Sequence, residues 1–455
     1  MSSQNPRQIA AQILGQRRVN GEFTETLLER ALANAKLSAP DRGLCHEIVY
    51  GCVRWQTTLD FLISKKTNGR EQKPALQNLL RLGLYQIFWL DRIPAHAAVH
   101  ETVESAKRSG FGPQAGFINA VLRGYLREFD ATKKILAHLK ISNPAMGFSH
   151  PQWLVEKWQK RFGDEKLRQL LEWNNSPPKT FARVNTLKID AGKLIEKWRE
   201  ENLEYDFTMV GRDSVEPCIS ETKKVTARET LAPPGWLPEN LIFELKSHPP
   251  LQLLQSFHDG WFYIQDPSTL LAPLELNPQR GETILDLCAA PGGKTTFIAQ
   301  LMNNEGKIVA SDVSEERLQL VSENCQRLGI TCIEPILVSA LDSRPSTFDK
   351  ILLDAPCSNT GVMRRRVDLR WRISPEEISR LRQAQLKLLK LAATKLKSSG
   401  TLIYSTCSLE PEENSEVVKE FLRAHKDFKL ESQRELLPFA DGVDGAFVAK
   451  LICCK

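Results

Sequence analysis

Long hydrophobic runs and regularly spaced cysteines are both missing from this sequence. No apolar stretch approaches the roughly 18 residues that cross a bilayer, and the N-terminus is polar, so we expect neither a membrane span nor a signal peptide. The ten cysteines follow no spacing typical of a zinc site or a disulfide framework. We therefore expect a monomeric protein of the reducing cytoplasm that binds no metal.

The charge is moderate in total and uneven along the chain. The 455 residues, enough for about three domains, carry a net charge of +6. Residues 1–150 hold 20 Lys and Arg against 12 Asp and Glu, so the remainder of the chain is slightly acidic. A basic first third is compatible with a polyanionic partner and, just as well, with an ordinary solvated surface.

Residues 1–145 predict a helical domain. A capping serine, a proline just inside the helix and an acid in the first turn mark a helix start at Ser38, and Thr24 predicts a cap for an earlier helix. His96 and His100 have the spacing of two metal ligands on one helical face. No third ligand follows nearby, so we interpret both histidines as packing or capping residues.

Residues 146–255 predict a small α+β domain with linkers. An amphipathic helix is expected over Pro151–Phe162, ended by Gly163, then a strand within Thr180–Ile189 and a helix near Ala191–Glu201. The rest of this region is rich in proline and has no assignable pattern.

Residues 256–455 alternate between strands and helices, which is typical of a doubly wound, largely parallel sheet. Ser314, followed by two glutamates, and Ser374, followed by a proline, both predict helix starts. Strands are expected to end at Asp354 and at Ser405. The expected architecture is therefore multidomain, with a helical bundle, a small α+β domain and an α/β domain in that order.

The stretch that organises the α/β region is Ile284–Lys294, with the sequence ILDLCAAPGGK. Its apolar start predicts a buried strand, its small residues a turn, and the following residues a helix. Such a turn brings backbone N–H groups to a ligand at a helix N-terminus. An acid at the end of the next strand would hold ribose hydroxyls, and Asp312, 19 residues after Gly293, is in that position.

A phosphate-binding loop is the rival interpretation of the same stretch. Gly293-Lys294-Thr295 fits the end of that motif, and Ile351–Asp354 is similar to the strand and acid that hold a metal in such enzymes. However, the first glycine of the motif would fall at Cys288. We favour the nucleoside interpretation.

Two cysteines follow two of the expected strands. Ligands bind beyond the carboxyl ends of strands in open α/β sheets, and Cys357 and Cys407, each followed by a serine, lie just past Asp354 and Ser405. If these strands are neighbours, both thiols open into one pocket beside the nucleoside site. The two cysteines also favour the nucleoside interpretation, because phosphoryl transfer does not require a pair of thiols.

Paired thiols beside a nucleoside cofactor suit methylation of carbon 5 of a cytosine. That carbon is a poor nucleophile until a thiolate adds to C6, and after methyl transfer a base must remove a proton from C5 before the thiolate departs. Nearby positive charge favours the thiolate, and Lys294 or Arg364-Arg365-Arg366 would supply it. The arginines, with Trp371, also suit an RNA-binding surface, although a solvated basic loop is the commoner outcome.

Three motifs, CAAPGGKT, LLDAPCSNTGVMRR and YSTCSLEPEEN, resemble those of the RNA cytosine-C5 methyltransferases. Asp41–Trp55, Leu79–Lys107 and Phe117–Arg123 resemble the NusB-like helical domain that precedes the bacterial ribosomal branch of that family, the RsmB/Sun/Fmu type. Arg183-Val184-Asn185 resembles the start of its small, RRM-like RNA-binding domain. The resemblance covers nearly the whole chain and implies a Rossmann-like methyltransferase domain over residues 256–455.

The resemblance also implies a role for each candidate residue. S-adenosylmethionine is the expected methyl donor, and 16S ribosomal RNA of the small subunit is the expected substrate. Cys407 would be the nucleophile, Cys357 would assist proton removal and release, and Asp354 would contact the N3 and amino edge of the cytosine. The expected cofactor-binding residues are Cys288, Ala289, Ala290, Pro291, Gly292, Gly293, Lys294, Asp312, Ser339 and Asp354, and the expected RNA-binding residues are Asn185, Arg364, Arg365, Arg366 and Trp371.

One position departs from the family pattern. The family has an acid in the turn after the third strand, where the adenine lies, and this chain has Ser339 there, with Asp342 as the nearest acid. Three alternative functions stay open: the same chemistry on transfer RNA, a non-catalytic RNA-binding or antitermination factor, and methylation of amino nitrogens. Loss of either cysteine would favour the second, and the third expects Pro-Pro and an aromatic after the acid, where this chain has Ala355-Pro356-Cys357.

Overall fold

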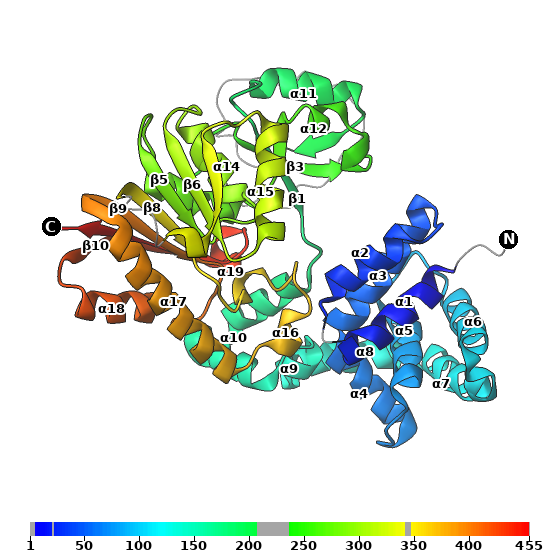
Figure 1. Cartoon of the computed structure of the whole chain (residues 1–455). Helices are drawn as coiled ribbons and strands as arrows, with labels where there is room; N and C mark the ends of the chain where they lie inside the picture. The colour runs from blue at the N-terminus through cyan, green and yellow to red at the C-terminus, as the bar shows by residue number, and fades with distance from the viewer. Residues whose placement is uncertain (1–4, 21, 207–235, 342–346, 455) are drawn as a thin grey trace. The chain divides into compact units, whose positions relative to one another are not determined.

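The computed structural model describes residues 5–20, 22–206, 236–341 and 347–454, and the chain divides into two compact units (Figure 1). Unit 1 comprises Met1–Ser176 together with Met363–Arg372, and unit 2 comprises Pro177–Val362 together with Ile373–Lys455. The chain therefore leaves unit 2 after Val362 and returns to it at Ile373.

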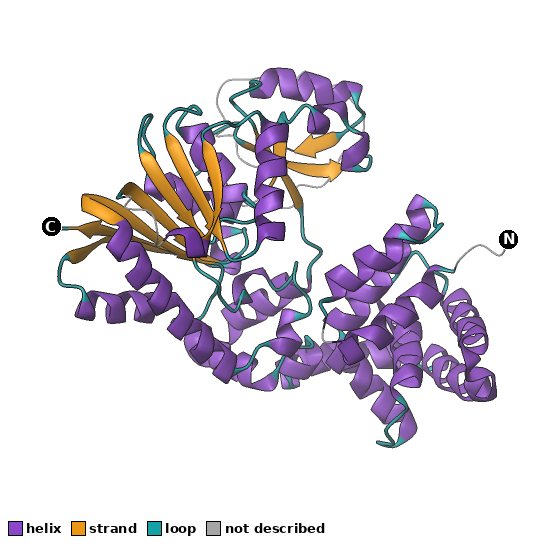
Figure 2. Cartoon of the chain, viewed as in Figure 1, coloured by secondary structure: helices purple, strands orange, loops and turns teal. Residues whose placement is uncertain are grey.

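Unit 1 is built from helices alone in its described residues (Figure 2). Their apolar faces form one buried core, which includes Ile48, Leu80 and Leu122. The helices are α1 (Pro6–Asn20), α2 (Thr24–Ala33), α3 (Ala39–Arg54), α4 (Gln56–Thr67), α5 (Pro74–Trp89), α6 (Ala95–Ala106), η1 (Lys107–Phe111), η2 (Gly112–Gln114), α7 (Ala115–Arg127), α8 (Phe129–Ser142), α9 (Pro144–Gly147), α10 (Gln152–Asn175) and α16 (Leu369–Arg372).

Two expected helix caps in unit 1 have different outcomes. At α3 the prediction is confirmed, because Ser38 Oγ accepts a hydrogen bond from the backbone N–H of Asp41 at 3.3 Å. At α2 the prediction is wrong, because Thr24 is already the first helical residue. The Asp368 carboxylate, far along the chain, accepts from the backbone N–H of Thr24 at 2.5 Å and from its hydroxyl at 2.8 Å.

Helix α10 runs further than its sequence indicates. It bends at Gly163, where φ is 76°, and continues to Asn175 instead of ending there. Residues of α10 that the sequence assigns to the middle domain thus belong to unit 1. The three expected domain ranges, 1–145, 146–255 and 256–455, stay predictions.

The smaller sheet of unit 2 is antiparallel, with strand order β2-β3-β1-β4. Its core is aromatic: the Trp198 ring meets the rings of Phe243 and Phe262 edge to face. Trp198 lies on the helix expected after the first strand. The elements are β1 (Thr180–Val184), α11 (Ala191–Glu200), β2 (Glu204–Asp206), β3 (Ile242–Ser247), η3 (Leu251–Leu253), α12 (Gln255–His258) and β4 (Phe262–Ile264).

The larger sheet of unit 2 has seven strands in the order β10-β11-β9-β8-β5-β6-β7. The strands β5 to β9 pair in parallel, whereas β10 and β11 are antiparallel to their neighbours. This confirms the expected α/β sheet, and the chain order reverses between β5 and β8, where such sheets bind ligands. The strands are β5 (Thr283–Leu287), β6 (Lys307–Asp312), β7 (Ile333–Leu337), β8 (Phe348–Asp354), β9 (Leu396–Thr406), β10 (Phe428–Leu436) and β11 (Ala446–Cys453).

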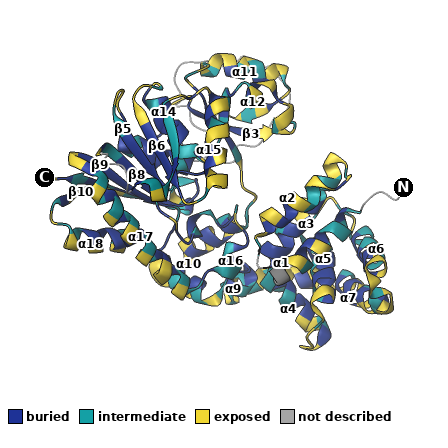
Figure 3. Cartoon of the chain, viewed as in Figure 1, coloured by how far each residue is buried: buried dark blue, intermediate teal, exposed yellow. Residues whose placement is uncertain are grey.

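Helices pack against the larger sheet, whose central strands are buried (Figure 3). Both expected caps are confirmed: Ser314 accepts from the N–H of Arg317, Ser374 accepts from the N–H of Glu377, and Gly329 ends α15. None of the helices in the described part of the chain has the length and hydropathy of a membrane span. The helices are η4 (Pro267–Leu270), α13 (Leu271–Leu276), α14 (Gly293–Leu301), α15 (Glu315–Leu328), η5 (Val338–Leu341), η6 (Thr360–Val362), α17 (Pro375–Lys395), α18 (Ser415–Ala424) and α19 (Pro438–Asp441).

Candidate active site

The two thiols expected at neighbouring strand ends do meet. Strands β8 and β9 pair in parallel with Asp354 opposite Ser405, so the loops that follow them start side by side. The Sγ atoms of Cys357 and Cys407 are 3.4 Å apart. A pair of sulfurs therefore lies just past the carboxyl edge of the sheet, next to the switch point.

Asn359 contacts both loops of the sulfur pair, and no spacing in the sequence points to it. Its backbone is left-handed, with φ of 56°, a conformation that asparagine tolerates better than most residues. Its side-chain amide donates to the Cys357 carbonyl oxygen at 2.7 Å, and its Oδ1 accepts from the Cys407 thiol at 2.9 Å. Asn359 thus bridges the two loops at the level of the sulfurs.

The two thiols differ in environment. Cys357 is buried, at 8% exposure, whereas Cys407 is half-buried. The hydrogen bond with Cys407 and burial together raise the pKa of Cys357 well above the usual thiol value. Cys357 therefore holds its proton at neutral pH, which suits a proton-handling group better than a nucleophile.

A cation and an acid stand at the same edge. The Lys294 ammonium donates to Asp354 Oδ2 at 2.6 Å, and Ser405 Oγ donates to Asp354 Oδ1 at 3.3 Å. Burial opposes the charge on Lys294, but the Asp354 carboxylate outweighs it, so the pKa of Lys294 is raised and the side chain stays protonated. The charge of Lys294 also interacts with the Cys407 sulfur.

The turn between β5 and α14 has the form of a nucleoside cradle. Gly292 has φ of 100°, and a Cβ on Gly293 would lie 3.2 Å from the Tyr263 ring, so both positions favour the absence of a side chain. Helix α14 starts without a side-chain cap, which leaves N–H groups at its N-terminus for a ligand. The backbone N–H groups of Cys288 and Ala289 donate to the Ser311 carbonyl oxygen, each at 2.9 Å, and hold the turn against β6.

The residues of this cradle fit an adenosyl cofactor. Asp312, at the end of β6, accepts from the N–H of Ala290 at 3.1 Å and of Val313 at 2.8 Å and pairs with Arg317 at 3.1 Å. A carboxylate has about four acceptor positions, so Asp312 keeps acceptor capacity for ribose hydroxyls.

Asp286, inside β5, is a functional candidate that we did not single out from the sequence. It is fully buried and accepts from Thr295 Oγ1 at 2.6 Å, while its other carboxylate oxygen has no hydrogen-bond partner among the described residues. Burial raises its pKa to about 7. A charge within an apolar strand was the available signal, because such a group is costly unless something pairs with it.

Two other expected cofactor residues have different surroundings. Burial raises the pKa of Cys288 to about 12, so this thiol is an unreactive wall of the cradle. Ser339 is exposed in η5, directly after β7. Asp342, the alternative to Ser339, lies outside the described residues.

Several of the expected RNA-binding residues have packing partners within their own units. In unit 2, the Asn185 amide donates to the carbonyl oxygens of Gly260 at 2.8 Å and Leu328 at 2.9 Å. In unit 1, Arg364 is 2% exposed and its guanidinium lies 3.9 Å from the centre of the Trp173 ring. Their RNA contacts stay predictions, and these side chains have structural roles in any case.

The other members of the basic segment are not equivalent to Arg364. The Trp371 indole N–H donates to the Val53 carbonyl oxygen at 2.7 Å. Arg365 is half-buried and Arg366 is exposed. Of the three arginines, Arg366 is therefore the best placed to meet a solvent-borne phosphate.

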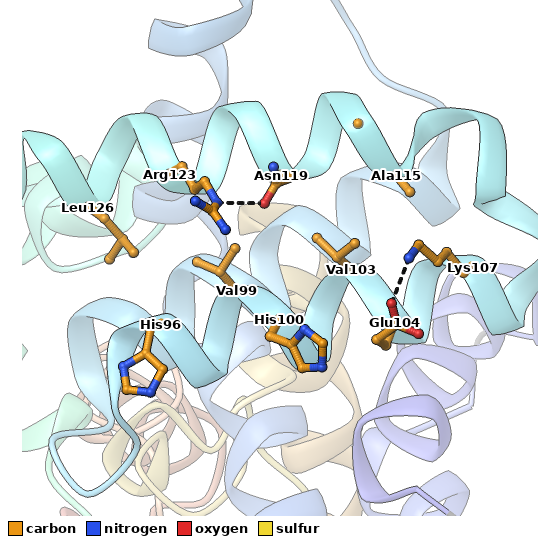
Figure 4. Close-up of a pocket in the computed structure, with 11 residues that line it drawn as sticks. His96, Val99, His100, Val103, Glu104, Lys107, Ala115, Asn119, Arg123 and Leu126 are labelled. Carbon is orange, nitrogen blue, oxygen red and sulfur yellow. Dashed lines mark hydrogen bonds and ion pairs between the residues drawn. The ribbon is translucent and has the colours of Figure 1, made fainter.

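His96 and His100 line a pocket of about 520 Å³ between α6 and α7 (Figure 4). Two polar pairs flank it, Lys107 with Glu104 and Arg123 with Asn119. Among the described residues, no three His, Cys, Asp or Glu side chains are grouped as a metal site requires. The pocket contains none of the groups that the expected chemistry needs.

Known proteins match the chain along its length. Three family models match: the NusB family over residues 4–127, the Methyltr_RsmF/B-like, ferredoxin-like domain over 150–216, and 16S rRNA methyltransferase RsmB/F over 273–452. The probable ribosomal RNA small subunit methyltransferase B of Bacillus subtilis (strain 168) is 33% identical over 480 residues, which cover 99% of each chain. The relative with the same name from Synechocystis sp. is 36% identical over 467 residues and 98% of each chain.

Solved structures agree with this assignment. The crystal structure of PH0851 is 25% identical, with a TM-score of 0.74 over 99% of both chains. The structure of NSun6 from Pyrococcus horikoshii with SFG, an analogue of S-adenosylmethionine, is 28% identical, with a TM-score of 0.54 over 67% of this chain and 98% of that one. The helical first unit, the small sheet, the methyltransferase sheet and the full-length relatives show together that this chain belongs to the RsmB/F family of 16S rRNA methyltransferases.

Proposed function

We propose that this chain transfers a methyl group from S-adenosylmethionine to carbon 5 of a cytosine in 16S ribosomal RNA, with cytosine 967 as the expected target. The names of the full-length relatives support ribosomal RNA of the small subunit as the substrate. One observation carries the choice of carbon 5: two sulfurs 3.4 Å apart beside a Lys–Asp pair at the cofactor edge of the sheet. Methylation of a nitrogen needs no thiol nucleophile.

Cys407 acts first in the proposed reaction. Its thiolate adds to C6 of the cytosine, and the electron pair of the C5–C6 double bond moves so that C5 becomes nucleophilic. The charge of Lys294 interacts with this sulfur. Asp354, held by Lys294 and Ser405, is oriented to meet the N3 and amino edge of the base.

S-adenosylmethionine supplies an electrophilic methyl group when it is bound. The glycine turn and the N-terminus of α14 would hold its polar tail, and Asp312 would accept its ribose hydroxyls. Asp286 has one carboxylate oxygen without a hydrogen-bond partner among the described residues, and its deprotonated form would favour the cationic part of the cofactor.

Cys357 completes the proposed cycle. After methyl transfer, the proton on C5 must leave so that the Cys407–C6 bond can break. Cys357 lies in contact with Cys407 and holds its own proton in the resting protein. To act as a base, Cys357 would first release its own proton to solvent, and this release is easier once Cys407 is bonded to C6, because the hydrogen bond between the two thiols is then lost. The Cys357 thiolate would then take the proton from C5, and the electron pair of that C–H bond would re-form the C5–C6 double bond as the Cys407–C6 bond breaks.

Bisulfite sequencing of 16S ribosomal RNA from a strain that lacks the gene tests the proposal. We expect one cytosine to lose its methylation, and a plasmid with the intact gene to restore it. A plasmid encoding the Cys407→Ala variant should fail to restore it although the protein accumulates. Unchanged 16S methylation, with loss at a transfer RNA cytosine instead, would replace the proposed substrate, and unchanged methylation in all RNA would reject the activity.

A further inference from the structure

Glu413 is a buried acid that the proposed chemistry does not use. It follows the Cys407 loop and is 0% exposed. Its carboxylate accepts from the backbone N–H of Ser358 at 2.9 Å, from the Ser358 hydroxyl, and from the Ser408 hydroxyl at 2.6 Å. Ser358 and Ser408 are the residues directly after the two thiols, so one carboxylate holds both Cys-Ser pairs.

The same carboxylate is fixed from a third direction. Gln385 of α17 donates one amide group both to Glu413 at 3.1 Å and to the Pro356 carbonyl oxygen at 3.0 Å. The Ser358 and Ser408 hydroxyl oxygens are themselves 3.0 Å apart. We call Glu413, Ser358, Ser408 and Gln385 the carboxylate clamp.

We propose that Glu413 is a positioning residue that sets the separation of the two sulfurs by binding both thiol loops from beneath. The residue does not reach the substrate, since it is fully enclosed and its oxygens accept four hydrogen bonds. Hydrogen bonds to an ionised carboxylate are about twice as strong as neutral ones, which suits a joint between two loops that belong to different strands. This inference rests on the proposed function for its meaning in catalysis, but not for its geometry.

Electrostatics give the clamp a second, measurable effect. Burial raises the pKa of Glu413 above the usual carboxyl value, and the hydrogen bonds from Ser358 and Ser408 oppose that rise. The charge of Glu413 in turn contributes to the raised pKa of Cys357. Removal of the charge should therefore lower the pKa of Cys357, and a wider separation of the sulfurs, which weakens the hydrogen bond with Cys407, should lower it in the same direction.

The Glu413→Gln variant tests the proposal in the full chain, with Glu416→Gln as the matched control. Glu416 is exposed on α18, three residues further along. We expect Glu413→Gln to lower kcat about 10- to 100-fold, since displacement of reacting groups by about 1 Å has effects of that size. The KM values for S-adenosylmethionine and RNA should stay within about twofold, and the pH profile of kcat should move to lower pH.

The separation of the two sulfurs can also be tested without measuring methylation, through the binding of an arsenical to both thiols. Phenylarsine oxide binds two adjacent thiols, forming two As–S bonds and releasing one water. Wild-type protein should bind it at Cys357 and Cys407, as shown by loss of that binding in Cys407→Ser. In Glu413→Gln the dissociation constant should rise about tenfold, because the thiols are no longer pre-organised, whereas Glu416→Gln should match wild type.

Each result decides between the inference and its rivals. Wild-type arsenical affinity and wild-type kcat in Glu413→Gln would overturn the clamp. A poorly folded Glu413→Gln would shift the test to Ser408→Ala, which removes a single hydroxyl from the clamp and should change both readouts in the same direction. Arsenical capture that depends on Glu413, in a wild-type protein without methyltransferase activity, would reject the proposed function and leave the clamp standing.

Discussion

The stretch Asp354–Asn359 and the stretch Arg364–Trp371 follow the same strand, and the sequence predicts function for both. In the first, the Cys357 thiol contacts the Cys407 thiol of the loop after β9, and the Asp354 carboxylate pairs with the Lys294 ammonium at the start of α14. In the second, the side chains build the helical unit, where Asp368 caps α2 and Arg370 is fully buried. The two stretches therefore differ in what their side chains contact. Those of the first contact the groups proposed to react, whereas Asp368 and Arg370 of the second stabilise the helical unit.

The largest expected effect on turnover comes from a change at Cys407, which contacts Cys357 of the first stretch. The Cys407→Ala variant should lose turnover by at least about 10⁴-fold, because it lacks the sulfur that is proposed to bond to C6, and the neighbouring Cys357 holds its proton. Equilibrium dialysis should show unchanged binding of S-adenosylmethionine, since the cradle is formed by the turn between β5 and α14 and by Asp312 and does not include Cys407. Persistent methyl transfer would remove the nucleophile from this position.

Cys357→Ala sharpens the comparison within the sulfur pair. We expect turnover to fall about 10²- to 10⁴-fold, the usual contribution of a positioned proton-transfer group. The adduct through Cys407 should then accumulate as a slowly migrating band on a denaturing gel, in the presence of RNA and cofactor. A gel with free protein alone would count against a role for Cys357 in release.

Asp286 tests the cofactor edge through the pH dependence of stability. Its pKa rises from 3.8 to about 7 on folding because it is buried. Between about pH 4 and pH 7 the folded state keeps a proton that the unfolded chain has released, so the free energy of unfolding should fall as the pH rises through that window. Urea unfolding should show a loss of about 2–4 kcal/mol in wild type that Asp286→Asn lacks; equal pH profiles would contradict it.

Asp368→Asn probes the second stretch. Its carboxylate pairs with Arg17 at 2.5 Å while capping α2, and both side chains are largely buried. Removal of this charge should lower the free energy of unfolding by about 3 kcal/mol, because a buried guanidinium loses its partner. Asp91→Asn, a change at an exposed acid of unit 1, is the control and should stay within about 0.5 kcal/mol.

The smallest expected effect separates Arg366 from Arg364. Arg366→Ala should weaken RNA binding modestly and reduce the slope of log affinity against log salt by about one, as for one phosphate contact. Arg364→Ala should instead destabilise unit 1, where its guanidinium stacks on Trp173. If Arg364→Ala changes the salt slope and leaves the melting temperature unchanged, the distinction between the two arginines fails.

The parallel strands, the glycine turn and the contact between Cys357 and Cys407 could be predicted from the sequence, because they depend on periodicity and on the common edge of parallel strands. The cap of α2 could not be predicted, because the Asp368 carboxylate accepts from the N–H of Thr24 and no local sequence pattern joins residues so far apart. Glu413 and Asp286 were not predicted as functional candidates for a related reason. Their importance lies in burial and in partners on other strands, which spacing along the chain does not encode.

The most direct measurement of the central claim uses wild-type protein and 16S RNA fragments that contain 5-fluorocytidine. Fluorine at C5 cannot leave as a proton does, so a methylated base should remain bonded to the nucleophile. Mass spectrometry of the digested adduct should place the modified, methylated nucleotide on the peptide that contains Cys407. An adduct on another residue, or methylated RNA without any adduct, would contradict the account.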